Sequence, residues 1–134
     1  KKISPNKEYA GIVNNNKYYA PLSSPKPKHA QMKEGSDFYK IKGGALGIIN
    51  LNNMIPVDDS LLKIVEITQM QDLKYQKLMM EQLRIIRNDI DKIKKKANKL
   101  YNLRYKPYTG NTLKNRCCDF LLLEKKLSEY IGSN

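Results

Sequence analysis

The stretch Leu83–Leu100, with the sequence LRIIRNDIDKIKKKANKL, decides how the second half of the chain folds. Its apolar residues recur at steps of three and four, which places them on one face of an α-helix. This apolar stripe consists of Leu83, Ile86, Ile90, Ile93, Ala97 and Leu100. The helical spacing extends from about Met70 to Leu103, which is long beside a mean helix of about 11–12 residues. We therefore expect a break in the helix, and Asn88 is the favoured position.

Downstream of this helix the sequence predicts a loop and one more helix. The segment Tyr105–Asn111 contains Pro107 and Gly110, which are typical of a loop. From Thr112 to Ile131 the apolar spacing is again helical. The predicted apolar face consists of Leu113, Cys117, Phe120, Leu121, Leu127 and Ile131.

The first half of the chain has the composition of short β-strands. The predicted strands are Tyr9–Val13, Lys17–Leu22, Phe38–Ile41, Ala45–Leu51 and Met54–Val57. Asn14–Asn16 and Gly43-Gly44 separate two pairs of them, and both residue types favour tight hairpin turns. We expect one α+β domain over residues 1–134, mainly β in 1–67 and mainly helical in 68–134. Its core would be a small, bent antiparallel sheet with helices packed on it.

The charge of the chain is strongly unbalanced. Its 134 residues contain 25 Lys and Arg against 13 Asp and Glu, a net charge of +12. Such an excess favours a polyanionic partner, with nucleic acid ahead of an anionic membrane surface. No apolar run approaches the roughly 18 residues of a membrane helix, and the first residues do not resemble a signal peptide. We expect a cytoplasmic protein without a membrane partner.

The predicted helix carries a run of lysines opposite its apolar stripe. These are Lys92, Lys94, Lys95, Lys96 and Lys99. A solvated face is one interpretation of this run, and a phosphate-binding stripe is the other. Only Asp89 and Asp91 offset the lysines nearby, so we favour contact with RNA or DNA.

Several kinds of catalytic chemistry have no support in the sequence. His29 is the single histidine, and no spacing typical of a metal site is present. We therefore expect neither a metal nor another cofactor. Gly43-Gly44 lacks the lysine of a phosphate-binding loop and is better interpreted as a turn. Cys117 and Cys118 are adjacent, so they pair only with strain, and we expect buried free thiols.

The segment Ser23–His29, with the sequence SSPKPKH, concentrates hydroxyl, ammonium and imidazole groups. Pro25 and Pro27 exclude a ladder strand and a helix interior, so we expect a rigid, exposed loop, followed by a brief helix within 30–35. Metal-independent RNA cleavage needs a base for the 2′-OH, an acid for the 5′-oxygen and cations near the phosphorane. An ordinary basic loop stiffened by prolines is the alternative interpretation.

Two longer motifs resemble a known protein family. The first is YYAPLSSPKPKH at 18–29, and the second is GIINLNNMIPV at 47–57. Together with the basic helical half, they are similar to the ToxN/AbiQ toxins, the protein components of type III toxin–antitoxin systems. The resemblance runs from about Glu8 to the last helix. Members begin with an additional strand and helix, of which this sequence shows at most a remnant at 1–5.

The resemblance implies a fold and an activity. The fold would be a compact, bent β core like that of Kid/MazF toxins, an SH3-like barrel with helices around it. The activity would be sequence-selective, metal-independent RNA cleavage that leaves a 2′,3′-cyclic phosphate. The partner would be an antitoxin RNA, cut by the toxin into pseudoknot units that close with it into a ring. Cellular and phage RNA would be substrates, no protein antitoxin would be needed, and many members abort phage infection.

The resemblance also assigns roles to particular residues. It places the catalytic groups at Ser24 and Lys26, with Ser23 as the hydroxyl residue before them. The candidate RNA-binding residues outside the lysine run are Lys7, Lys28, His29, Asn50, Asn52 and Asn53. The three asparagines either contact a base edge or make the turn, and we favour the turn.

Two other function classes compete with this hypothesis. A non-catalytic RNA- or DNA-binding domain would explain the charge but gives no reason for the Ser–Pro–Lys segment. A helical protein-interaction module with a basic exterior is the third class.

Overall fold

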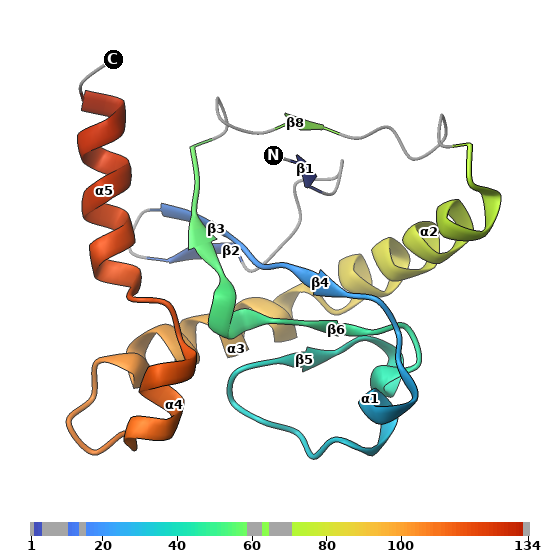
Figure 1. The fold of residues 1–134 in the computed structure, drawn as a ribbon, viewed down its shortest axis with the longest axis horizontal. Helices are drawn as coiled ribbons and strands as arrows, with labels where there is room; N and C mark the ends of the chain where they lie inside the picture. Colours follow the sequence, from blue (N-terminus) through green and yellow to red (C-terminus); the bar gives the residue numbers. More distant parts are fainter. Residues whose placement is uncertain (1, 4–10, 14–15, 59–62, 65–70, 133–134) are drawn as a thin grey trace.

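The computed structural model describes residues 2–3, 11–13, 16–58, 63–64 and 71–132. Among these residues the chain forms eight short strands, and helices make up most of its second half (Figure 1). The strands are β1 (Lys2–Ile3), β2 (Gly11–Val13), β3 (Asn16–Tyr19), β4 (Leu22–Ser23), β5 (Tyr39–Lys40), β6 (Ile48–Ile49), β7 (Ile55–Pro56) and β8 (Lys63–Ile64). The α+β class predicted from the sequence is confirmed.

The strands divide into three small sheets. β2, β3 and β7 form one antiparallel sheet, and β4, β6 and β5 form a second, while β1 and β8 pair in parallel. Val13 pairs with Asn16 at the end of the first hairpin, as the asparagine turn predicts. Tyr39 pairs with Ile49 in the second hairpin. The strands described here do not close into the barrel that the family resemblance implied.

The long helical segment is two helices, α2 (Leu73–Asn88) and α3 (Ile90–Arg104), which confirms the predicted break. Asp89 stands between them with φ −100° and ψ 10°, outside helical geometry. Its carboxylate accepts a 2.9 Å hydrogen bond from the hydroxyl of Tyr39. The break is therefore fixed over the β5 strand. Along the predicted stripe Ile86, Ile93, Ala97 and Leu100 are buried, and Leu83 and Ile90 are half-buried.

The prediction of one continuous last helix was wrong. The segment forms α4 (Asn111–Arg116) and α5 (Phe120–Gly132), separated by three residues in which the backbone of Cys117 is extended. The amide of Cys118 leaves the helix to donate to the carbonyl of Asn52 at 2.9 Å. Asp119 Oδ1 then accepts from the amide of Leu122 at 3.4 Å, in the manner of a helix N-cap.

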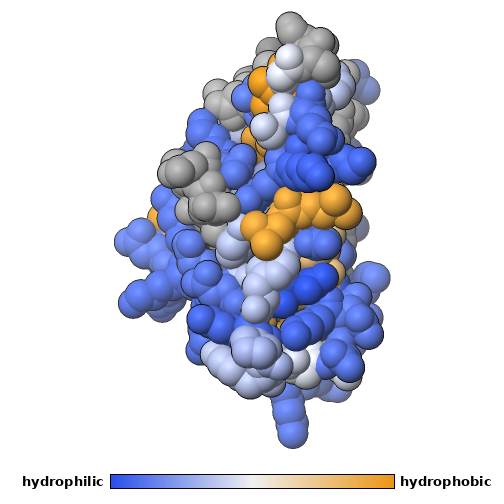
Figure 2. Space-filling model, turned by 90° about the vertical axis from the view of Figure 1, so that its left-hand side faces the viewer, coloured by the Kyte–Doolittle hydropathy of each residue, from blue (hydrophilic) through white to orange (hydrophobic). Residues whose placement is uncertain are grey.

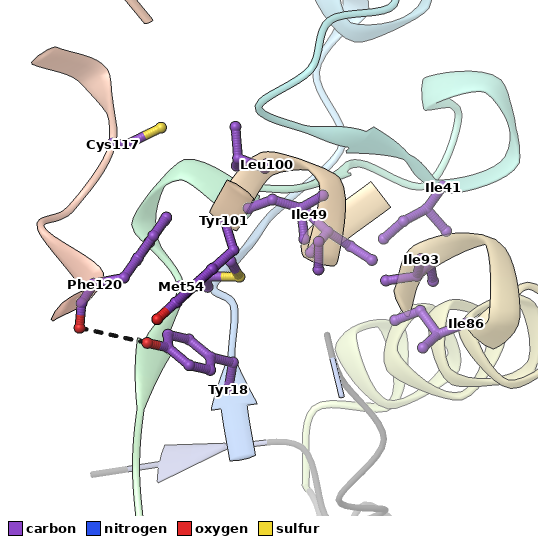
Figure 3. Close-up of a cluster of buried hydrophobic side chains, with 12 residues drawn as sticks. Tyr18, Ile41, Ile49, Met54, Ile86, Ile93, Leu100, Tyr101, Cys117 and Phe120 are labelled. Carbon is purple, nitrogen blue, oxygen red and sulfur yellow. Dashed lines mark hydrogen bonds between the residues drawn. The ribbon is translucent and has the colours of Figure 1, made fainter. Parts of the chain in front are cut away.

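The core draws on both halves of the chain. Tyr18 from β3 packs edge-on against Tyr101 of α3 and Phe120 of α5, with ring centroids 5.9 and 5.8 Å apart. Tyr101 and Phe120 stack on each other at 5.5 Å. Figure 3 shows these rings beside Met54, and the cluster continues to Ile93 of α3 and Ile86 of α2. The helical stripe therefore covers the sheets.

The hydroxyl of Tyr18 makes the one long-range polar contact drawn in this cluster. It lies 3.5 Å from the carbonyl oxygen of Phe120 and donates to Glu124 Oε2. Burial raises the pKa of Tyr18 well above its usual value, and the hydrogen bond to Glu124 adds to that effect. The hydroxyl therefore stays protonated and ties β3 to α5.

Tyr18→Phe is expected to destabilise the fold by about 1.5–3 kcal/mol, because it leaves a carboxylate without its buried donor. Urea unfolding would measure this change. Tyr108→Phe is the matched control, since Tyr108 is 76% exposed, and it should change stability by less than about 0.5 kcal/mol. Equal midpoints for the two variants would contradict the role given to Tyr18.

Candidate active site

The Ser23–His29 segment begins on a strand and ends in a helix. Ser23 lies in β4 and pairs with Ile48 of β6. α1 (Pro27–Gln31) starts four residues later and places Pro27 in its first turn, where a missing N–H costs nothing. The predicted helix therefore starts earlier than the 30–35 segment. Ser24, Pro25 and Lys26 between the two elements are exposed, as predicted.

His29 is the exception to the predicted exposed loop, because its side chain is only 1% exposed. Its Nδ1 accepts a hydrogen bond from the backbone N–H of Lys26 at 3.2 Å. Burial lowers the pKa of His29, and the charges of Lys28 and Lys26 lower it further. The proposed RNA contact by His29 does not fit this placement. The side chain instead holds the backbone at Lys26.

Two glycines bring the turn at 41–47 against this segment. A Cβ on Gly47 would lie 2.1 Å from the carbonyl oxygen of Ser23, and one on Gly44 would lie 2.6 Å from that of His29. Both glycines have positive φ values, +101° and +97°, which other residues rarely adopt. The turn is the short 3₁₀ element η1 (Ile41–Gly44) and its continuation. The sequence analysis did not predict these close approaches, although glycines at 44 and 47 are the sequence feature that permits them.

Ser23 and Asn50 come together in the structure. Asn50 Nδ2 donates to Ser23 Oγ at 2.8 Å, and the backbone N–H of Asn50 donates to the carbonyl of Pro21 at 2.9 Å. Because the serine oxygen accepts from the amide, its own proton is directed to another acceptor. Asn50 therefore orients a hydroxyl next to Ser24.

Asn52 and Asn53 belong to the turn, as favoured from the sequence. They lie in the 3₁₀ element η2 (Leu51–Asn53). The side chain of Asn52 donates to the carbonyl of Arg116 at 3.0 Å. The backbone carbonyl of Asn52 accepts a hydrogen bond from the N–H of Cys118. Asn53 is exposed.

The predicted lysine run separates into two groups. Four of its lysines line a groove of about 510 Å³ together with Glu34, Gly35 and Ser36: Lys92, Lys95, Lys96 and Lys99. Lys94 follows Lys92 by two residues and so lies on another side of α3. Lys96 pairs with Glu34 at 3.0 Å and stands 5.7 Å from the Phe38 ring centre.

The remaining sequence predictions have simple outcomes. Lys28 is exposed on α1, whereas Lys7 lies outside the described residues. Cys117 is buried and Cys118 half-buried, and both are free, as predicted. Burial raises the pKa of Cys117 to about 11. In the described ranges no cluster of three His, Cys, Asp or Glu side chains could hold a metal ion. No described helix has the length and apolar character needed to cross a membrane.

These features define a class of protein. It is a small, basic α+β protein that presents an exposed Ser–Pro–Lys segment beside an oriented serine. It also carries a lysine-lined groove on α3. The surface seen from the side of α5 is mostly hydrophilic (Figure 2). The net charge of +12 suits a phosphate-rich partner.

Comparison with known proteins identifies the family. The family model described as "Toxin ToxN, type III toxin-antitoxin system" matches residues 1–128, and the chain belongs to this family. It is 34% identical over 133 residues to the Endoribonuclease ToxN of Pectobacterium atrosepticum, covering 92% of this chain and 75% of that protein.

Two solved structures share the fold. One is a type III toxin selectively inhibited by a non-coding RNA pseudoknot, with a TM-score of 0.69, 27% identity and coverage of 88% of this chain and 74% of that one. The other is AbiQ, a lactococcal anti-phage endoribonuclease of a type III system. It matches with a TM-score of 0.71 and 26% identity over 89% of this chain and 74% of that one.

The buried His29 makes stability depend on pH near neutrality. The pKa of His29 in the folded state is below the usual value of about 6.5. As the pH falls below that value, the unfolded chain therefore binds a proton at His29 before the folded chain does. Stability should therefore be full above about pH 6.5 and fall as the pH drops below it. Urea midpoints between pH 7.5 and 5.5 would measure this change.

His29→Asn is the matched variant for this measurement. The asparagine amide oxygen can replace Nδ1 as the acceptor for Lys26 but does not titrate. Since His29 is the only histidine, the variant should flatten the pH dependence in this window. If wild type and variant lost stability in parallel, the assignment would be wrong.

Proposed function

We propose that the chain is a sequence-selective, metal-independent endoribonuclease toxin over residues 1–134. The observation that carries this proposal is the exposed segment Ser24–Lys26 next to the Asn50-oriented Ser23 in a member of the ToxN family. The endoribonuclease activity of its relatives supports the same conclusion.

The reaction uses the substrate's own nucleophile. The RNA 2′-OH attacks the adjacent phosphorus while the bond from phosphorus to the 5′-oxygen breaks. The products are a 2′,3′-cyclic phosphate and a 5′-hydroxyl. The protein needs to take one proton, return one to the leaving oxygen and stabilise the negative charge of the phosphorane.

The described geometry suggests a division of these tasks. The ammonium of Lys26 supplies positive charge or a proton at an exposed position, with its backbone fixed by His29. Ser24 is free of the strand and can donate to a phosphate oxygen. Ser23 accepts from Asn50, so its proton is available to the same phosphate. Exposure of Ser24 and Lys26 gives RNA access to both groups.

The same proposal includes the RNA partner. A relative is inhibited by a non-coding RNA pseudoknot, and we propose a pseudoknot antitoxin, cut by the toxin itself, that closes with it into a protein–RNA ring. The lysine-lined groove and Lys28 would contact its phosphates. Growth inhibition and abortive phage infection would follow from release of the toxin, in keeping with the anti-phage role of AbiQ.

Ser24→Ala and Lys26→Ala are expected to lower cleavage by about 100-fold or more each, the usual cost of losing a group that stabilises transition-state charge. RNA binding should fall far less. The assay is cleavage of mixed RNA in excess EDTA by RNA-free protein, with identification of the 3′ ends. Ser128→Ala and Lys125→Ala on the exposed face of α5 are matched controls that should cleave like wild type.

Cyclic phosphate ends that disappear in the site variants would support the proposal. If a folded wild-type protein bound RNA without cutting it, the enzyme hypothesis would fail. The net charge of +12 would then favour the non-catalytic RNA- or DNA-binding domain.

The groove makes a separate prediction about binding. Lys95→Gln with Lys99→Gln should reduce the slope of log K against log salt for single-stranded RNA by about 1.4, because each phosphate contact contributes about 0.7. Lys94→Gln with Lys74→Gln changes the net charge equally but lies outside the groove lining. Equal slopes for the two double variants would exclude the groove as a phosphate site.

A further inference from the structure

A second pocket lies next to the candidate active site. It has a volume of about 450 Å³ and is lined by residues that include Lys33, Asp37, Phe38, Asn50, Asn52 and Arg116. Its size falls within the range of small-ligand sites. None of the roles proposed above uses it as a pocket.

The pocket adjoins Ser23 through two of its lining residues. Asn50 lines the pocket and also donates to Ser23 Oγ at 2.8 Å. Ile48 lines it too and is the direct partner of Ser23 in the β4–β6 ladder. Directly paired residues present their side chains on the same face of a sheet. A group in this pocket is therefore a near neighbour of the phosphate that Ser23 and Ser24 would hold.

The lining has the chemistry that recognises a nucleobase. Phe38 offers an aromatic ring, and unpaired RNA bases stack on such rings. Arg116, Asn50 and Asp37 offer donors and acceptors for a base edge. We infer that this pocket binds the base next to the cleaved phosphate and sets the sequence preference of the enzyme. This inference rests on the proposed endoribonuclease function.

The pocket wall is held in place before RNA binds. Arg116 Nε pairs with Asp37 Oδ2 at 3.0 Å, and the Asp37 side chain is only 13% exposed. Asn52 joins the same two residues through their backbones. Its N–H donates to the Asp37 carbonyl, and its side chain donates to the Arg116 carbonyl, both at 3.0 Å. A prearranged pocket loses less entropy on binding and discriminates more sharply.

The pocket and the lysine-lined groove share a wall. Gly35 lines both, and Lys96 from the groove stands over the ring of Phe38 from the pocket. A Cβ on Gly35 would lie 2.8 Å from that ring, so the glycine permits its position. One RNA strand can therefore place phosphates among the lysines and a base against Phe38. Affinity would come from the first contact and selectivity from the second.

The test maps cleavage sites of RNA-free full-length protein on a random-sequence single-stranded RNA pool. Arg116→Lys keeps a cation beside Asp37 but loses the planar fork that contacts two edge atoms. Phe38→Leu keeps apolar volume but loses the stacking face. Each should reduce discrimination at one base position next to the cut by roughly ten-fold. Arg84→Lys is the matched control, because Arg84 forms an exposed 3.0 Å pair with Glu81 on α2.

The outcomes distinguish a failure of the pocket inference from a failure of the proposed endoribonuclease function. Relaxed preference at one position in both pocket variants, with the Arg84→Lys pattern unchanged, would support it. A wild-type protein that cuts selectively, and pocket variants that cut at the same sites with the same preference, would overturn the pocket while leaving the endoribonuclease intact. A wild-type protein that does not cut RNA would overturn both. Thermal unfolding of Arg116→Lys and of Phe38→Leu at the wild-type temperature would show that a changed cleavage pattern does not come from unfolding.

Discussion

The aromatic contact between Tyr18, Tyr101 and Phe120 joins the parts of the structure on which the rest depends. It connects β3, α3 and α5, which come from opposite ends of the sequence. The strand that carries Tyr18 continues directly into the segment that holds Ser23 and Ser24. The position of the candidate active site is therefore set by an apolar core that contains none of its reactive groups. Such a division lets the exposed segment carry lysines and serines without a cost in core packing.

Contacts to the backbone of Ser23–His29 hold the candidate active-site segment in place. Gly44 and Gly47 let the 41–47 turn approach the carbonyls of His29 and Ser23. The carbonyl of Leu46 in that turn accepts a 2.9 Å hydrogen bond from the buried side chain of Gln82 on α2. His29 adds a hydrogen bond to the amide of Lys26. α2, the 41–47 turn and the Ser23–His29 segment thus form one connected support. A lysine or serine held this way would keep its geometry in the proposed complex with RNA.

Much of this arrangement could be predicted from local sequence signals. The asparagine turn gave the first hairpin, and the apolar spacing with its excess length gave α2 and α3. Predictions failed where a distant contact decided the outcome. The predicted last helix breaks at 117–119 because the backbone N–H of Cys118 donates to the carbonyl of Asn52. The residue spacing within that segment cannot predict a hydrogen-bond partner 66 residues away. His29 is buried because Gly44 and η1 cover α1. The groove was predicted as a stripe, but its far wall, Glu34–Ser36, lies outside the helical periodicity.

The short segment 34–38 separates the two RNA contacts proposed above. On one side Glu34 pairs with Lys96 among the groove lysines. On the other, Asp37 pairs with Arg116 in the pocket beside Ser23. Each acidic residue pairs with one cation, and the remaining positive charge attracts any RNA without regard to its sequence, so selectivity depends on the fit to the pocket. The exposed Glu34 pair is easily displaced by phosphate, whereas the shielded Asp37 pair is part of the pocket wall. Under the proposed function, the protein would bind RNA broadly through the lysine-lined groove and cut it selectively through the pocket beside Ser23.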